Sequence, residues 1–333
     1  MNICVYPSGA WGTALALHLD RSGHRVTLIA RDLEEALEMT TRREHKRRLP
    51  GVELPASFQI STELTPALME ADVAILACPS KFLRDTCKEL KAKSGLATNL
   101  RWVLALCKGL EVDTNRLPLE VMEDELPGYQ IGVLSGPTFA SEVAKGQPSA
   151  IVLGTKAPAK ETQALQAAMS DRTLRVYTSD DPVGVQLGGC LKNVYAIAAG
   201  MGIGLGLGHN STAALVTRAL RELVRVGGAL GGNPETFFGL SGLGDLMLTC
   251  NGDESRNRRF GKLLAEGSTV EQLLESGMTV EGYRSAACFH AICQEEGISA
   301  PILDQVYSIL FEGQNLLAAL TALMERDLKN EAF

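Results

Sequence analysis

A lysine stands inside the longest apolar stretch of the sequence, where an ammonium group could act as an acid. Lys192 lies within residues 183–201, between Leu191 and Asn193. Burial removes hydration from an ammonium group and lowers its pKa unless a carboxylate compensates. An amine tuned in this way can give a proton to a carbonyl oxygen while hydride arrives at the carbon. Periodicity alone favours the alternative, a lysine whose head group extends to solvent.

Two further charged residues stand where they could serve the same chemistry. Asp245 lies in the glycine-framed apolar segment 242–246, where it could also be a helix cap. Lys108 follows the predicted strand 102–106 and therefore lies at the carboxyl edge of the expected sheet, where open α/β sheets collect their ligands. The alternative for Lys108 is a flexible surface lysine.

A candidate phosphate site opens a helix after the turn 251–253. Ser255, Arg256 and Asn257 supply a hydroxyl, a guanidinium and an amide at a helix N-terminus, whose free N–H groups also attract anions. A merely basic helix start would oppose the helix dipole. The pattern therefore favours phosphate binding over a solvated basic turn.

The beginning of the chain resembles a dinucleotide-binding turn that has lost one glycine. A buried strand is predicted at 3–6 and a helix from Ala10, and the turn between them reads Pro7-Ser8-Gly9-Ala10-Trp11-Gly12 instead of G-x-G-x-x-G. Gly9 and Gly12 hold the second and third glycine positions, which allow close approach to a diphosphate and helix–strand packing. A strand–helix turn without a ligand is the alternative.

The end of the second predicted strand, 26–30, bears on the choice of coenzyme. Arg31 follows that strand and suits a 2′-phosphate, whereas Asp32 keeps NAD open or caps the next helix, 33–40. The basic run 42–48 fits a solvated loop as well as a coenzyme contact.

The elements that position these residues follow two different patterns. Up to about residue 178, short apolar runs alternate with helical segments such as 81–91 and 159–169, which predicts a mostly parallel sheet with helices on both faces. The predicted strands are 3–6, 26–30, 73–77, 102–106, 130–134, 150–153 and 174–177. From Ser179-Asp180-Asp181-Pro182 onward the pattern is helical. We expect a Rossmann-type dinucleotide-binding domain at 1–179 and an all-α substrate and catalytic domain at 180–333.

Composition limits the classes of partner. The chain has 333 residues, enough for two domains, with 45% hydrophobic residues and a net charge of −7, which argues against nucleic-acid binding. Polar residues interrupt the stretch 183–201, and no signal peptide precedes the first strand, so we expect a cytoplasmic protein without integral membrane contact. Eight scattered cysteines without zinc spacing predict reduced thiols and no metal site, and ordinary packing is favoured over reactivity for Cys250. Monomer and homodimer both stay open.

Three long motifs resemble the soluble bacterial family of NAD(P)-dependent glycerol-3-phosphate dehydrogenases. They are LSGPTFASEVAKGQPSA (134–150), LGGCLKNVYAIAAGMGIGLGLGHNSTAALVTRAL (187–220) and GLSGLGDLMLTCNGDESRNRRFG (239–261). The shorter AWGTALA, ALCKGLE and VEG (10–16, 105–111 and 280–282) also fit, so the resemblance covers essentially the whole chain in order. It implies reduction of dihydroxyacetone phosphate to sn-glycerol 3-phosphate, reversibly, as the entry to glycerophospholipid synthesis.

The resemblance also implies roles for individual residues. Lys192, Asp245 and Lys108 would be catalytic, with Lys192 as the acid/base and Asp245 positioning it. The substrate, a small phosphorylated molecule, would contact these three and Gly136, Thr138, Ser255, Arg256 and Asn257. NAD(P)H, with NADPH slightly favoured, would contact Ser8, Gly9, Ala10, Trp11, Gly12, Arg31, Lys108, Ala140, Arg256 and Glu281.

Two departures from the family pattern fall on the coenzyme side. Pro7 and Ser8 replace Gly-Ala, and His45 begins a segment, 45–50, that reads N-x-x-Y-L-P in the family. We expect the site in a cleft between the two domains. The rivals are a related two-domain reductase of another small oxo acid, which the Ser-Arg-Asn triplet disfavours, and a catalytically silent nucleotide-binding sensor, which has no use for Lys192.

Overall fold

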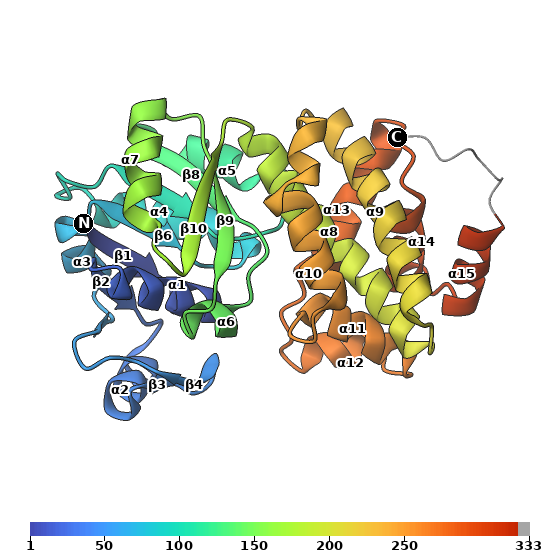
Figure 1. The fold of residues 1–333 in the computed structure, drawn as a ribbon, viewed down its shortest axis with the longest axis horizontal. Coiled ribbons are helices and arrows are strands. Elements are labelled where there is room, and N and C mark those ends of the chain that lie inside the picture. Colours follow the sequence, from blue (N-terminus) through green and yellow to red (C-terminus); the bar gives the residue numbers. More distant parts are fainter. Residues whose placement is uncertain (326–333) are drawn as a thin grey trace. The chain divides into compact units, whose positions relative to one another are not determined.

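The computed structural model describes residues 1–325, so that 326–333 of the expected second domain lie outside the described residues. The chain divides into two compact units (Figure 1). Unit 1 comprises Met1–Glu111 and Arg116–Pro182, and unit 2 comprises Val112–Asn115 and the chain from Val183 onward. The predicted domain boundary, 179/180, lies close to the change from unit 1 to unit 2.

Unit 1 is built on an eight-stranded sheet of order β10-β9-β8-β7-β6-β1-β2-β5. All neighbouring strands are parallel except β8 and β9, which are antiparallel. The strands are β1 Asn2–Tyr6, β2 Arg25–Ile29, β5 Gln59–Ser61, β6 Val73–Leu76, β7 Trp102–Ala105, β8 Gln130–Ser135, β9 Ser149–Gly154 and β10 Leu174–Ser179. The order of the six strands from β5 to β8 is that of a dinucleotide-binding domain, with β1 at the centre. The predicted Rossmann-type fold with a mostly parallel sheet is confirmed.

Every strand predicted from the sequence is present in this sheet, and three short strands are additional. β5 is three residues long and adds to the edge beside β2. β3 (Glu44–His45) and β4 (Leu49–Glu53) form a separate antiparallel pair. The basic run 42–48 is therefore partly a strand, and His45 within it is buried, so the interpretation as a uniformly solvated loop is wrong.

Helices cover both faces of the sheet of unit 1 (Figure 1). They are α1 Ala10–Arg21, α2 Leu33–Arg42, α3 Leu64–Glu70, α4 Leu83–Lys93, α5 Pro118–Glu125, α6 Ala140–Ala144 and α7 Ala159–Met169. α1 packs against α6, while α4 packs against α3 and α5. Because both faces are covered, the central strands β6 and β7 are buried along their whole length.

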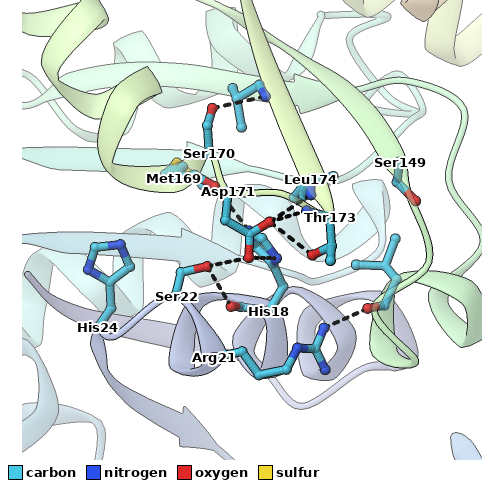
Figure 2. A network of polar contacts seen from close by, with 12 residues as sticks. His18, Arg21, Ser22, His24, Ser149, Met169, Ser170, Asp171, Thr173 and Leu174 are labelled. Carbon is cyan, nitrogen blue, oxygen red and sulfur yellow. Dashed lines mark hydrogen bonds and ion pairs between the residues drawn. The ribbon is translucent and has the colours of Figure 1, made fainter.

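A polar network fixes the C-terminal end of α1 to the turn between α7 and β10 (Figure 2). Asp171 accepts hydrogen bonds from the N–H groups of Thr173 (2.6 Å) and Leu174 (2.8 Å), and its other oxygen accepts one from Ser22 Oγ at 3.1 Å. His18, fully buried on α1, contacts the Met169 carbonyl through Nε2 at 3.0 Å. The network holds α1, whose first turn belongs to the candidate coenzyme site.

The described part of unit 2 is helical, as predicted. Its α-helices are α8 Pro182–Gly204, α9 His209–Ala229, α10 Asp245–Asn251, α11 Arg256–Ala265, α12 Val270–Glu275, α13 Glu281–Glu295, α14 Pro301–Phe311 and α15 Leu316–Met324. No helix within residues 1–325 has the length and apolar character needed to cross a membrane.

The long helix α8 is buried over most of its length, because most of its residues are apolar and they are distributed around the helix. It crosses α11 closely enough that a Cβ atom on Gly200 would lie 1.9 Å from the Arg258 carbonyl oxygen. Only glycine permits this approach. The crossing joins the helix that carries Lys192 to the helix that follows Ser255.

Candidate active site

The first turn of unit 1 keeps the packing role of the third fingerprint glycine. A Cβ atom on Gly12 would lie 2.6 Å from Ala77 Cβ and 3.1 Å from the Pro7 carbonyl oxygen, so α1 can approach the sheet only with glycine there. Gly9 is the N-cap of α1. The N–H groups of the first helical turn have no partner within the helix and point toward its N-terminal end, where an anion can bind. The turn therefore fits the diphosphate of a dinucleotide.

The turn has its own hydrogen bonds although the first glycine is replaced by Pro7. The Ser8 N–H donates to the Ile29 carbonyl and the Gly9 N–H donates to the Pro7 carbonyl, both at 2.8 Å. The Ser8 hydroxyl donates to Glu35 Oε2 at 2.8 Å and is buried. The Ser8 side chain is thus bound within the protein.

At the end of β2, Arg31 is exposed and pairs with Glu35 at 3.1 Å. Asp32 accepts a hydrogen bond from the Glu35 N–H at 2.8 Å and so caps α2. The sequence left two interpretations of Asp32 open, a coenzyme contact and a helix cap, and the structure shows Asp32 as the N-cap of α2. Arg31 remains as the residue that could read a 2′-phosphate.

Lys108, Gly136 and Thr138 lie together at the carboxyl ends of β7 and β8. Lys108 Nζ donates to the Gly136 carbonyl at 3.0 Å, and Thr138 Oγ1 donates to the same oxygen at 3.4 Å. Ala140 begins α6 two residues later. The ammonium group is held at the edge of the sheet where ligands collect, so the alternative of a free surface lysine does not hold.

In unit 2, Lys192 and Asp245 form a buried ion pair. Lys192 Nζ lies 2.5 Å from Asp245 Oδ1 and 2.7 Å from Thr249 Oγ1, and the two charged residues are 6% and 1% exposed. Thr249 donates to the Asp245 main-chain carbonyl at 2.6 Å. The alternative of a solvent-extended Lys192 is therefore wrong. The carboxylate compensates the buried ammonium, which is the condition for keeping an acid there.

The backbone around Asp245 is unusual. The π-helical turn Leu240–Gly244 runs directly into α10, and Asp245 is the first residue of that helix. Such π-helical turns occur frequently at functional sites. Asp245 and Thr249 are four residues apart on α10 and so lie on the same face, toward Lys192.

The predicted phosphate residues gather at the N-terminus of α11. Ser255 is the N-cap, and its Oγ accepts a hydrogen bond from the Arg258 N–H at 3.2 Å. Arg256, the first helical residue, is exposed. Asn257 is buried: its Nδ2 donates to Asn193 Oδ1 at 2.9 Å, and its Oδ1 accepts the Gly282 N–H at 3.0 Å. Asn257 thus links α11 to α8 and α13.

The structure also places one further predicted residue, one cysteine and one residue that the sequence analysis missed. Glu281, the predicted coenzyme contact, begins α13 immediately before Gly282. Cys250 is fully buried, and burial raises the pKa of its thiol to about 12, which leaves it protonated and agrees with ordinary packing. Thr249 was not predicted, although its spacing of four residues from Asp245 is a signal that could have found it.

Comparisons with known proteins show the family of the chain. The profile of the NAD-dependent glycerol-3-phosphate dehydrogenase N-terminus matches residues 2–161, and that of the C-terminus matches residues 181–321. A glycerol-3-phosphate dehydrogenase [NAD(P)+] of Thiobacillus denitrificans is 44% identical, covering 99% of this chain and 100% of its own. One from Pseudoalteromonas translucida is 40% identical, covering 99% and 98%.

A solved structure shows the same fold. The crystal structure of glycerol-3-phosphate dehydrogenase from Coxiella burnetii superposes with a TM-score of 0.90 at 36% identity, over 97% of this chain and 98% of that one. Both halves of the sequence, the full-length relatives and the fold thus agree. The chain belongs to the NAD-dependent glycerol-3-phosphate dehydrogenase family.

Proposed function

We propose that the chain reduces dihydroxyacetone phosphate to sn-glycerol 3-phosphate with NAD(P)H, and that the reaction is reversible. The observation that carries the proposal is the buried contact of Lys192 with Asp245 and Thr249, in a chain of this family. A bound nicotinamide coenzyme supplies a hydride, and the reduction of a ketone consumes one hydride and one proton. The protein must therefore provide the proton.

Lys192 is the proton donor in this proposal. Its ammonium group gives a proton to the carbonyl oxygen as the C–H bond forms at the carbonyl carbon, and it recovers a proton from solvent after product leaves. Asp245 and Thr249 hold Nζ from two directions and fix where that proton points. In the reverse direction the neutral amine takes the proton from the hydroxyl group.

The substrate phosphate is held by Ser255, Arg256 and Asn257. Ser255 Oγ accepts its helix-capping bond and so keeps its hydrogen to donate. Asn257 donates one Nδ2 hydrogen to Asn193 and keeps the second for a ligand. The exposed Arg256 adds a full positive charge at the N-terminus of α11. In unit 1, Lys108, Gly136 and Thr138 contact the substrate as well.

The coenzyme is held mainly by unit 1. The N-terminal turn of α1 from Gly9 to Gly12 binds the diphosphate, with the backbone of Ser8 beside it. Arg31 contacts the adenosine ribose and gives NADPH a slight advantage. Further contacts come from Lys108 and Ala140 in unit 1, and from Arg256 and Glu281 in unit 2.

The same proposal places the reaction in the cytoplasm, where its product enters glycerophospholipid synthesis. It holds for a monomer and for a homodimer alike.

The test is the oxidation of NADH and NADPH, followed by absorbance, with dihydroxyacetone phosphate and with dihydroxyacetone. We expect turnover with the phosphorylated ketone and a much lower kcat/KM without the phosphate. Equal kcat/KM values for both ketones would contradict the phosphate site, and no coenzyme oxidation with either would contradict the proposed reaction.

A further inference from the structure

Four polar residues join the coenzyme turn to the end of β2, and we call them the Glu35 network. Its members are Ser8, Arg31, Glu35 and His45. Glu35 Oε2 accepts hydrogen bonds from Ser8 Oγ at 2.8 Å and from the Arg31 N–H at 3.0 Å. Glu35 Oε1 accepts one from the Arg31 guanidinium at 3.1 Å. One carboxylate thus binds both segments that the coenzyme would contact.

His45 completes the network from the strand β3. Its Nε2 lies 3.0 Å from the Ser8 carbonyl oxygen, an acceptor only, so Nε2 carries the hydrogen. The same nitrogen lies 3.5 Å from Glu35 Oε1. Ser8 and His45 are each 1% exposed. Both stand at positions where the chain departs from its family's pattern, and the structure joins these departures through one carboxylate.

Glu35 carries its negative charge although only 9% of it is exposed. Burial raises the pKa of this carboxyl group, but the hydrogen bonds from Arg31 and Ser8 outweigh burial and lower it overall. The Arg31 guanidinium therefore never faces a ligand as an isolated cation. The ionised carboxylate of Glu35 accepts a hydrogen bond from it.

This pairing matters for the coenzyme because the end of β2 is where dinucleotide-binding domains read the adenosine ribose. NADPH carries an additional 2′-phosphate there, with a charge near −2 at neutral pH, and NADH does not. Arg31 attracts that phosphate, whereas the charge of Glu35 repels it. The two effects largely cancel as long as the pair is intact.

We propose that Glu35 is a specificity-determining residue that fixes Arg31 and offsets its charge, so that NADH and NADPH bind with similar affinity. The inference rests on the coenzyme site of the proposed function and does not depend on the proposed proton transfer. Glu35 acts through Arg31 and Ser8, so it is a positioning residue.

The experiment measures the Kd of NADH and of NADPH by calorimetric titration of the full chain, without substrate, at fixed pH and ionic strength. Glu35→Gln removes the charge and keeps an acceptor for Ser8 or Arg31. It should shift the ratio of the two Kd values toward NADPH by about fivefold or more, the scale of one unit charge acting on a dianion across several ångströms of partly hydrated protein.

Glu34→Gln is the matched control, because Glu34 is the preceding residue on α2 and is exposed. It removes the same charge outside the network and should change the ratio less than twofold. Adding Arg31→Ala to Glu35→Gln should abolish the gain for NADPH, since the guanidinium that was freed is gone. A Glu35→Gln ratio within twofold of the wild type, or one shifted toward NADH, would overturn the proposal.

Arg31→Ala tests the balance of charges between Arg31 and Glu35 even where Glu35→Gln does not fold. Arg31→Ala in the wild-type background leaves the Glu35 charge uncompensated, so the Kd of NADPH should rise at least about tenfold and that of NADH less than threefold. Equal weakening of both coenzymes would overturn the proposal. Coenzyme binding without turnover of dihydroxyacetone phosphate would instead contradict the proposed function and leave the role of Glu35 intact.

Discussion

Replacing Asp245 by asparagine perturbs the buried ion pair with little change of shape. In the wild type, Lys192 Nζ lies 2.5 Å from Asp245 Oδ1, and Lys192 is only 6% exposed. Removing one member of a buried pair costs about 3–5 kcal/mol, because the remaining charge has lost its compensation. Lys192 donates a hydrogen bond to Thr249 as well, so we expect the lower end, about 3 kcal/mol of the free energy of unfolding at neutral pH.

The same substitution removes the carboxylate that holds the Lys192 ammonium in place. We therefore expect kcat at neutral pH to fall at least ~100-fold.

A double-mutant cycle in urea separates the pair from the general effect of each substitution. Lys192→Met removes the cation with little loss of volume, and combining it with Asp245→Asn leaves no unpaired charge. The double variant should be more stable than Asp245→Asn alone, with a coupling free energy of about 2 kcal/mol or more. A cost below about 1 kcal/mol for Asp245→Asn, or a double variant less stable than both single ones, would refute this reasoning.

Three further outcomes are expected. Arg256→Ala should cost about 2–3 kcal/mol in kcat/KM for dihydroxyacetone phosphate and little for dihydroxyacetone, and equal losses in steady-state assays would place Arg256 outside the phosphate site. Gly12→Ala should destabilise unit 1 by about 1–3 kcal/mol in thermal unfolding, because the new Cβ would lie 2.6 Å from Ala77 Cβ. Gly9→Ala is the control and should not destabilise it, because the new Cβ would lie 3.5 Å from the Ala77 oxygen. Equal effects of the two substitutions would contradict the packing argument. Burial raises the pKa of Asp171, but the hydrogen bonds that its carboxylate accepts from N–H groups lower it to about 2. The stabilisation by the ionised carboxylate is therefore present above pH ~4 and is lost as pH falls toward 2. The difference in unfolding free energy between wild type and Asp171→Asn, measured in urea, should shrink by about 1 kcal/mol from pH 5 to pH 3, and a constant difference would refute the role of this carboxylate.

The sequence predicted the elements whose side chains carry a strong local signal. β6 and β7 are continuous apolar runs buried on both faces, and α8 is a long, mostly apolar helix, so their patterns admit few alternatives. β5, three residues long, has no such pattern. The same holds for β3, whose buried His45 stands in a basic run.

The contacts of the site follow from tertiary packing, which spacing along the chain does not reveal. Lys192 and Asp245 are 53 residues apart, and periodicity alone favoured a Lys192 side chain that extends to solvent. Ser8 meets Glu35 across 27 residues and His45 across 37. The sequence identified the departures at Ser8 and His45 but could not show that both contact Glu35.

Single-turnover oxidation of NADPH and NADH by dihydroxyacetone phosphate, compared between the wild type and Lys192→Met, tests the role of the buried lysine most directly. The Kd of each coenzyme, titrated on the same samples, shows whether the variant still binds it. We predict that Lys192→Met leaves both Kd values within about threefold of the wild type and slows the chemical step at least ~100-fold. A variant that binds coenzyme normally and retains more than about a tenth of the wild-type rate would contradict Lys192 as the proton donor.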